Sequence, residues 1–280
     1  MNHQYQVTIF RAEQLQKLRN VRILSPSIIQ IITGSKRLFW KDSAAELSHS
    51  ELLLCEASAS LSFENMPHKG RFLSRVFSFQ FQPSQAMLDL SEERSNDLGL
   101  PKVQADRSLQ DSLNALFSFD RQSMSKETQQ FWLQGLYQQL AEKGVLHRLF
   151  ISSNVSFSQK LSHYLSHSPD EKHPLESVAE RFAMSRATLI RKLKLEGMQY
   201  REVLAEVRLS HALYLMQNGQ QNVAMLAQSC GYQSEGRFSQ RFKGKFGLSP
   251  SEYIKTVVSN TVASNKVASN KVASNKVATP

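Results

Sequence analysis

Two short stretches of this chain combine basic side chains with apolar anchors at the same spacing. Residues 185–194 read SRATLIRKLK and residues 234–243 read SEGRFSQRFK. Each begins with Ser, carries apolar residues four and eight positions later, and ends on a basic, an apolar and a basic residue. Apolar residues four apart share one buried helix face, so the basic residues face elsewhere. One such run would be explained by a solvated charged surface, but an internal repeat favours a shared binding chemistry.

The outward faces of these two helices carry side chains that can recognise DNA. A turn of about 100° per residue separates the buried anchors from the exposed set. Arg bonds guanine in a bidentate manner, Gln does so with adenine, an exposed Ile contacts the thymine methyl, and Lys suits phosphate. Because the buried anchors match and the exposed sets differ, the repeat predicts two distinct reading heads for double-stranded DNA. The candidate DNA-binding residues are Arg186, Ala187, Thr188, Ile190, Arg191, Lys194, Glu235, Gly236, Arg237, Ser239, Gln240 and Lys243.

Each reading helix is preceded by a shorter helix and a tight turn. Ser185 and Ser234 are predicted N-caps, so the second helix of each pair, 186–196 and 235–246, starts at a defined residue. The chain therefore contains a helix-turn-helix unit twice.

A long helix is predicted between the two units, over residues 200–219 with its end at Gly219. Its length of about 27 Å, together with the helix widths, can hold two reading helices near the ~34 Å separation of successive major-groove faces. The phenylalanines at 238, 242 and 246 hold the second reading helix, and the basic residues around them, Lys245 included, meet DNA.

Residues 173–254 resemble the DNA-binding domain of the AraC/XylS family of bacterial transcription regulators. The stretch NVAMLAQSCGYQSEGRFSQRFKGKFGLSPSEY matches the family signature closely. The first unit departs from it at Ala183, where the family usually has Gly, and at Leu193, where Phe is common. The resemblance implies a DNA-binding regulator, an activator of virulence or stress genes, with RNA polymerase as a partner.

Composition and charge agree with a two-domain protein of 280 residues. The net charge is +10, and residues 156–258 carry 14 Lys and Arg against 9 Asp and Glu, whereas residues 1–155 carry 17 against 15. This distribution favours a polyanionic partner for the later segment. The start of the chain lacks a signal-peptide pattern and no stretch is long and apolar enough for a membrane span. We therefore expect a soluble, cytoplasmic, nucleoid-associated bacterial protein without membrane contact.

The first hundred residues are rich in strand signals. Alternating or apolar runs at 27–40, 51–63 and 75–81 predict a β-sandwich or small barrel, and the pattern then becomes helical at 108–119 and 126–144. The expected fold class is α+β: a cupin-like N-terminal β-barrel domain with helices for ligand binding and dimerisation at 1–155, then an all-α double helix-turn-helix domain at 156–258. The tail 259–280 repeats VASNK and is expected to be disordered.

Helix 126–144 has a broad apolar stripe that allows two interpretations. It is either part of the core or a surface through which a homodimer forms. The stripe consists of Phe131, Leu133, Leu136, Tyr137 and Leu140.

A narrower resemblance involves the first domain. The segments LFWKDS (38–43) and SNVSFSQKL (153–161) resemble those of enteric virulence regulators of the ToxT and Rns type. This resemblance implies a fatty-acid effector whose carboxylate pairs with basic residues, one mapping onto Arg37 with Lys36 adjacent. A second basic position maps onto Gln217, so either the ligand differs or another residue completes the clamp. Lys36 and Arg37 could equally be surface residues at a turn after Gly34.

Enzymatic and RNA-binding alternatives have less support. His163 and His167 lie four apart as metal ligands can, but no third ligand is evident, and a solvated helix face is the simpler interpretation. Cys55 and Cys230 form neither a metal motif nor a disulfide framework. We therefore expect no enzyme, no cofactor and no metal. The aromatic pattern of RNA-binding sheets is missing, and an architectural DNA-binding protein without effector remains the alternative function.

Overall fold

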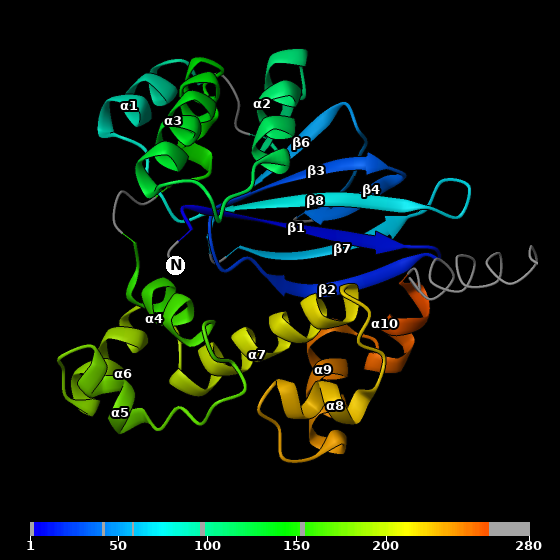
Figure 1. Ribbon diagram of the computed structural model, residues 1–280, viewed down its shortest axis with the longest axis vertical. Helices are drawn as coiled ribbons and strands as arrows, with labels where there is room; N and C mark the ends of the chain where they lie inside the picture. Colours follow the sequence, from blue (N-terminus) through cyan, green and yellow to red (C-terminus); the bar gives the residue numbers. More distant parts are fainter. Residues whose placement is uncertain (1–2, 41–42, 58, 96–98, 152–154, 258–280) are drawn as a thin grey trace, which may run out of the picture.

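The computed structural model describes residues 3–40, 43–57, 59–95, 99–151 and 155–257. The predicted tail at 259–280 lies outside these residues, as do parts of the segments 38–43 and 153–161. Strands come first and helices last along the chain, and α7 runs beneath the strands β1 and β2 (Figure 1).

Among the described residues, the N-terminal part contains nine strands in two antiparallel sheets. One sheet has the order β1-β8-β3-β6-β9 and the other β2-β7-β4-β5. Within the described residues no strand pairing joins the two sheets, so the cupin-like sheet domain is an open sandwich and no closed barrel. The strands are β1 Tyr5–Ala12, β2 Gln16–Arg22, β3 Ser27–Thr33, β4 Ser35–Trp40, β5 Ser43–Leu47, β6 Glu51–Cys55, β7 Ser60–Met66, β8 Phe72–Phe79 and β9 Lys102–Gln104.

Two of the expected strands are each divided. The run 27–40 is split at Gly34, which has φ +80°, and a Cβ there would lie 2.5 Å from the carbonyl oxygen of Met66. Only glycine fits this turn between the two sheets. The run 51–63 becomes β6 and β7, again one strand in each sheet. Alternation of polar and apolar residues identified the strands, but the change of sheet leaves no mark in that alternation.

Three helices cover the first sheet at the top of Figure 1: α1 Gln85–Glu93, α2 Arg107–Ser118 and α3 Lys126–Glu142. A 3₁₀ turn follows at Leu146–Arg148. Gly144, with φ +69°, follows the helix end as expected. The predicted stripe on α3 is mostly core, because Leu133, Leu136 and Tyr137 are buried with the phenylalanines of β8. Phe131 and Trp132 are instead 72% and 49% exposed.

Seven helices occur in residues 155–257, the described part of the second half of the chain. They are α4 Phe157–Leu165, α5 Leu175–Arg181, α6 Arg186–Leu195, α7 Tyr200–Gln217, α8 Val223–Ser229, α9 Glu235–Phe246 and α10 Pro250–Thr256. The hydroxyls of Ser185 and Ser234 accept hydrogen bonds from the backbone amides of Thr188 and Arg237, so both predicted N-caps are confirmed. The long helix ends at Gln217, and Gly219 adopts φ +93° beyond it.

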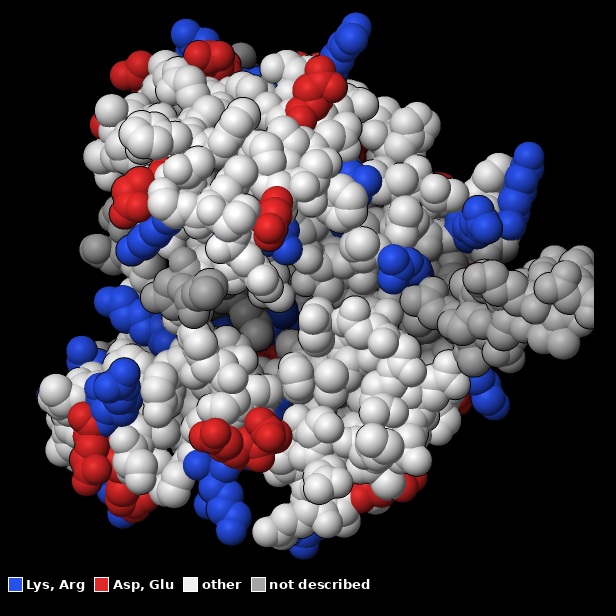
Figure 2. All heavy atoms as spheres, viewed as in Figure 1, with Lys and Arg blue, Asp and Glu red and all other residues white. Residues whose placement is uncertain are grey.

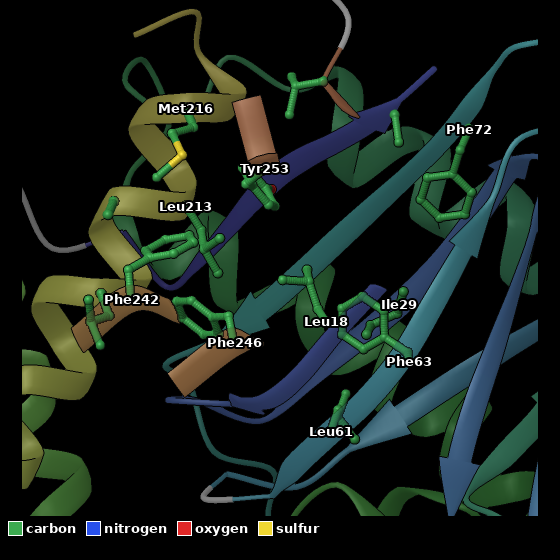
Figure 3. Packing of buried hydrophobic residues seen from close by; sticks show 14 of the residues in the cluster. Leu18, Ile29, Leu61, Phe63, Phe72, Leu213, Met216, Phe242, Phe246 and Tyr253 are labelled. Carbon is green, nitrogen blue, oxygen red and sulfur yellow. The ribbon is translucent and has the colours of Figure 1, made fainter. Parts of the chain in front are cut away.

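The two helix-turn-helix units belong to different hydrophobic cores. The first unit packs with α4 and the start of α7 around Leu189, Leu193 and Val203. The second unit shares one continuous core with the sandwich, in which Phe242 and Phe246 of α9 meet Leu18 of β2 (Figure 3). Burial of aromatic side chains on both sides of this boundary makes the second unit an integral part of the N-terminal fold.

Candidate DNA-binding surface and ligand cavity

The two predicted reading faces are solvent-exposed on α6 and α9. On α6, Arg191 and Lys194 are exposed and Ile190 is 48% exposed, an unusual position for a large apolar side chain. On α9, Gln240 and Lys243 are exposed. The buried sides hold the leucines and phenylalanines that the repeat predicted. Both helices therefore present their variable residues outward from an apolar anchor.

Two of the predicted DNA-binding residues in the first unit have structural partners. Arg186 forms an ion pair with Glu176 of α5 at 2.8 Å, between its Nη1 and the Oε1 of the glutamate. The hydroxyl of Thr188 lies 3.0 Å from the hydroxyl of Ser185 and is part of the cap. Ala187 is exposed. In the second unit Glu235, Gly236 and Arg237 are exposed and Ser239 is half-buried.

Lys245 does not lie with the other basic residues of α9. Its ammonium donates to a carboxylate oxygen of Glu206 on α7, and its side chain is largely buried. The expectation that every basic residue around the phenylalanines meets DNA is wrong for this position, because Lys245 fixes α9 to the long helix. Figure 2 shows acidic and basic side chains interspersed over the helical part on the face it displays.

A cavity of about 450 Å³ lies between the two sheets and the helices α4 and α7. Its wall is apolar around Phe10, Leu18, Ile29, Val76 and Leu213. Two basic side chains also line it, Lys36 from β4 and Arg22 from β2, and no carboxylate is among the described residues that line it. A cavity of this size and polarity suits a small ligand with an apolar body and an anionic end.

Lys36 lies inside this cavity and Arg37 lies outside it. Lys36 is 3% exposed, its ammonium is 3.5 Å from the centre of the Phe63 ring, and it donates to Oδ1 of Asn65. Arg37 is 44% exposed in its side chain and pairs with Glu64 at 3.3 Å. Successive side chains of a strand point to opposite faces, so only one of two neighbours can line the cavity. The surface interpretation is therefore wrong for Lys36 and right for Arg37.

Burial lowers the pKa of Lys36 from 10.5 to about 7, because the charged ammonium loses its hydration. The nearby Cys55 thiol has its pKa raised by burial to about 12 and stays neutral. No ion pair of Lys36 occurs within the part of the chain that the structure describes. An anionic ligand would restore the charged form of this lysine.

Gln217, onto which a second basic position had been mapped, has a different role. Its Oε1 accepts from the Arg11 amide at 2.8 Å, while its Nε2 donates to the Arg11 carbonyl at 3.1 Å and the Tyr253 hydroxyl at 2.7 Å. It joins β1, α7 and α10 and does not line the cavity. The second cation of the cavity wall is Arg22, at the end of β2.

A chain of buried polar side chains leads from the cavity to α10. Asn65, which holds Lys36, donates to Oε1 of Gln16 at 2.8 Å. Gln16 donates to Oγ1 of Thr256 at 2.6 Å, and Thr256 donates to the carbonyl of Tyr253 at 2.6 Å. The sequence offered no signal for the bonds of Gln16, because Asn65 and Thr256 are 49 and 240 residues away from it in the chain.

Among the described residues, no group of three or more His, Cys, Asp and Glu side chains is arranged to hold a metal ion. The His163 and His167 rings are 4.8 Å apart, and Nδ1 of His167 lies 2.8 Å from the His163 carbonyl oxygen. None of the described helices is long and apolar enough to cross a membrane.

The helical part of the chain matches a known domain family. A helix-turn-helix domain family matches residues 178–256, which cover both units and the long helix between them. Residues 178–256 therefore form a helix-turn-helix domain.

Two proteins similar to part of this chain are transcription regulators by name. An uncharacterised helix-turn-helix transcriptional regulator of Haemophilus influenzae is 37% identical over 123 residues, which is 44% of this chain and 40% of that protein. The urease operon transcriptional activator of Escherichia coli is 27% identical over 130 residues, 46% of this chain and 43% of that protein. The chain thus spans less than half the length of these curated relatives.

The fold of the whole chain has a counterpart in a solved structure. The crystal structure of unsaturated fatty acid bound wild-type ToxT from Vibrio cholerae superposes with a TM-score of 0.63, over 92% of this chain and 98% of that one, at 18% sequence identity. At that identity the likeness establishes the fold: a sheet domain with helices, followed by the helical domain.

Proposed function

We propose that this protein is a sequence-specific transcription regulator that binds double-stranded DNA over two adjacent major-groove segments. The observation that carries the proposal is the pair of exposed, chemically different faces on α6 and α9, each anchored on the same buried pattern and started by a serine cap. A shared scaffold with different exposed sets predicts an asymmetric site.

Binding selection on randomised duplexes, followed by fluorescence anisotropy on the selected site, tests this proposal. Arg191→Ala and Gln240→Ala should each relax base preference in a separate half of the site, at a cost of roughly 1–3 kcal/mol. Lys194→Ala and Lys243→Ala should weaken all sequences alike and lower the salt slope. Equal losses on every sequence for all four variants would leave an architectural DNA-binding protein as the better interpretation.

A matched control is available in Arg107, which lies on α2 with a side chain that is 96% exposed. Arg107→Ala removes the same charge from the sheet domain, far along the chain from either reading helix. It should leave both affinity and base preference unchanged.

We further propose that a long-chain fatty acid in the cavity modulates DNA binding. Four features of the cavity support this. Its volume is about 450 Å³, its wall is apolar, Lys36 and Arg22 line it, and no carboxylate lines it among the described residues. The carboxylate would pair with the Lys36 ammonium and the tail would lie along Leu18, Ile29 and Val76. A ligand at this boundary can change DNA affinity because the second reading helix shares the adjoining core.

Calorimetric titration of the full chain with oleate tests the effector. Binding should be lost in Lys36→Met and weakened in Arg22→Met, whereas Arg37→Met, the neighbouring cation outside the cavity, should bind as the wild type does. Absence of oleate binding to the wild type would refute the effector and leave the DNA-binding proposal standing.

Two partners complete the proposal. Activation of transcription requires contact with RNA polymerase, and the name of the E. coli relative, a transcriptional activator, favours activation over repression. A homodimer would form through the exposed pair Phe131 and Trp132 on α3, since the rest of the predicted stripe is core. Sedimentation velocity of Phe131→Ser against the wild type tests that contact.

A further inference from the structure

The relative placement of the two reading helices is a separate problem from their individual structures. The first unit has its own core, and the second shares the core of the sandwich. The long helix α7 passes through both, with Val203 and Val207 in the first core and Leu209 and Leu213 in the second. The change of core therefore falls between residues 207 and 209.

Arg208 lies at this change of core. Its Nε donates to the Pro169 carbonyl at 3.0 Å, and its Nη2 donates to the Glu171 carbonyl at 2.9 Å. Both carbonyls belong to the loop between α4 and α5, which leads into the first unit. Two charge-assisted bonds from one planar guanidinium fix that loop in position and in angle.

The same guanidinium also lies against the turn of the second unit. A Cβ on Gly231 would lie 2.5 Å from Nη2 of Arg208, and Gly231 has φ +70°. The guanidinium carbon is also 6.0 Å from the centre of the Tyr232 ring. Gly231 and Tyr232 form the turn between α8 and α9. One side chain therefore touches the loop before the first unit and the turn inside the second.

We propose that Arg208 is the positioning residue that sets the separation and rotation of the two reading helices, and so the half-site spacing that the protein accepts. The inference rests on the proposed function, since spacing has meaning only for a two-part DNA site. Without the guanidinium each unit keeps its own core, but the loop of one and the turn of the other lose their common contact. One added base pair moves a half-site by about 3.4 Å and rotates it by roughly 35°. Two reading helices that are free to shift relative to each other would therefore bind spacings that the native protein rejects.

The test measures affinity for the selected duplex and for two others with the segment between the half-sites one base pair shorter or longer. We expect the wild type to lose roughly 10-fold or more on the altered duplexes, the size of a poor base-pair match. Arg208→Met should bind the selected duplex more weakly and lose most of this discrimination. Its affinity for the selected duplex should exceed that for the altered duplexes by less than about 3-fold. Arg208→Lys, which keeps the charge without the planar fork, should fall between them.

Two glycines provide a matched pair of variants. Gly231→Ala adds a Cβ that must displace Arg208, whereas Gly219→Ala meets the same kind of backbone strain, at φ +93°, with no neighbour within 4 Å. Gly231→Ala should lose spacing discrimination and Gly219→Ala should keep the wild-type ratio. Thermal melting of each variant separates this readout from a loss of folding.

The outcomes distinguish the two proposals. Folded Arg208→Lys and Gly231→Ala proteins with the wild-type spacing ratio would overturn the role of Arg208. A wild-type protein that prefers no duplex over random DNA would instead refute the proposed function. If Arg208→Met does not fold, Arg208→Lys and Gly231→Ala carry the test.

Discussion

Replacing Lys36 with Met should stabilise the protein at neutral pH, although it removes a buried hydrogen bond. Lys36 is fully charged in the unfolded chain at pH 7, whereas burial lowers its folded pKa from 10.5 to about 7. The unfolded state therefore binds more protons between these values, and stability rises with pH across this window. The free-energy cost of burying the Lys36 charge is fully present below pH 7, and it fades as the pH approaches 10.5.

The size of the effect follows from the two pKa values. A difference between 10.5 and about 7 corresponds to a penalty of about 4 kcal/mol at pH 7, falling to about 3 kcal/mol at pH 8.5. Met has a similar length and no charge, so Lys36→Met removes the penalty but leaves Oδ1 of Asn65 without its donor, at a cost of about 1–3 kcal/mol. The variant should gain about 1–3 kcal/mol at pH 7, and that gain should shrink by about 1–2 kcal/mol at pH 8.5.

Urea unfolding at pH 6, 7 and 8.5 measures this gain, with Arg37→Met as the control. Arg37 is a half-exposed neighbour in a surface ion pair, so its loss should cost less than about 1 kcal/mol at each pH. Burial raises the pKa of Cys55 to about 12, and loss of the Lys36 charge would raise it further, so the thiol stays neutral in all three folded proteins at these pH values. A Lys36→Met protein less stable than the wild type at pH 7, or a difference that does not change with pH, would refute the reasoning.

The remaining predictions concern packing and the polar chain below the cavity. Phe242→Ala should cost about 3–5 kcal/mol and lower the stability of both domains in one transition, because the two domains share that core. Circular dichroism melts and amide exchange would show this. The control Phe131→Ala, at an exposed position, should cost less than about 0.5 kcal/mol. Gln16→Leu should remove the acceptor of Asn65 Nδ2 and the donor to Thr256 Oγ1, at a cost of about 1–3 kcal/mol for each bond, as measured by urea unfolding. A neutral effect would indicate that neither bond matters.

Local chemistry determined much of this protein from the sequence alone. The serine caps, the four-residue spacing of the apolar anchors and the glycine stop after the long helix are short-range signals, and they defined α6, α9 and α7 to within two residues. The alternating pattern likewise identified a sheet domain, and the exposed sets on the reading helices followed from helical periodicity.

Contacts between residues far apart in the chain were decided only by the tertiary structure. Lys36 and Arg37 have similar chemistry in the sequence, and the side of β4 that each occupies depends on which sheet packs above it. Gln217 stands at the position where the resemblance implied a second basic residue. Its side-chain amide instead hydrogen-bonds the backbone of Arg11, 206 residues away. Arg208 appeared as one basic residue on a helix, because neither the loop at 169–171 nor the turn at 231–232 is near it until the two cores form. Periodicity specifies which face of an element is buried, and it contains no information about which partner will bury it.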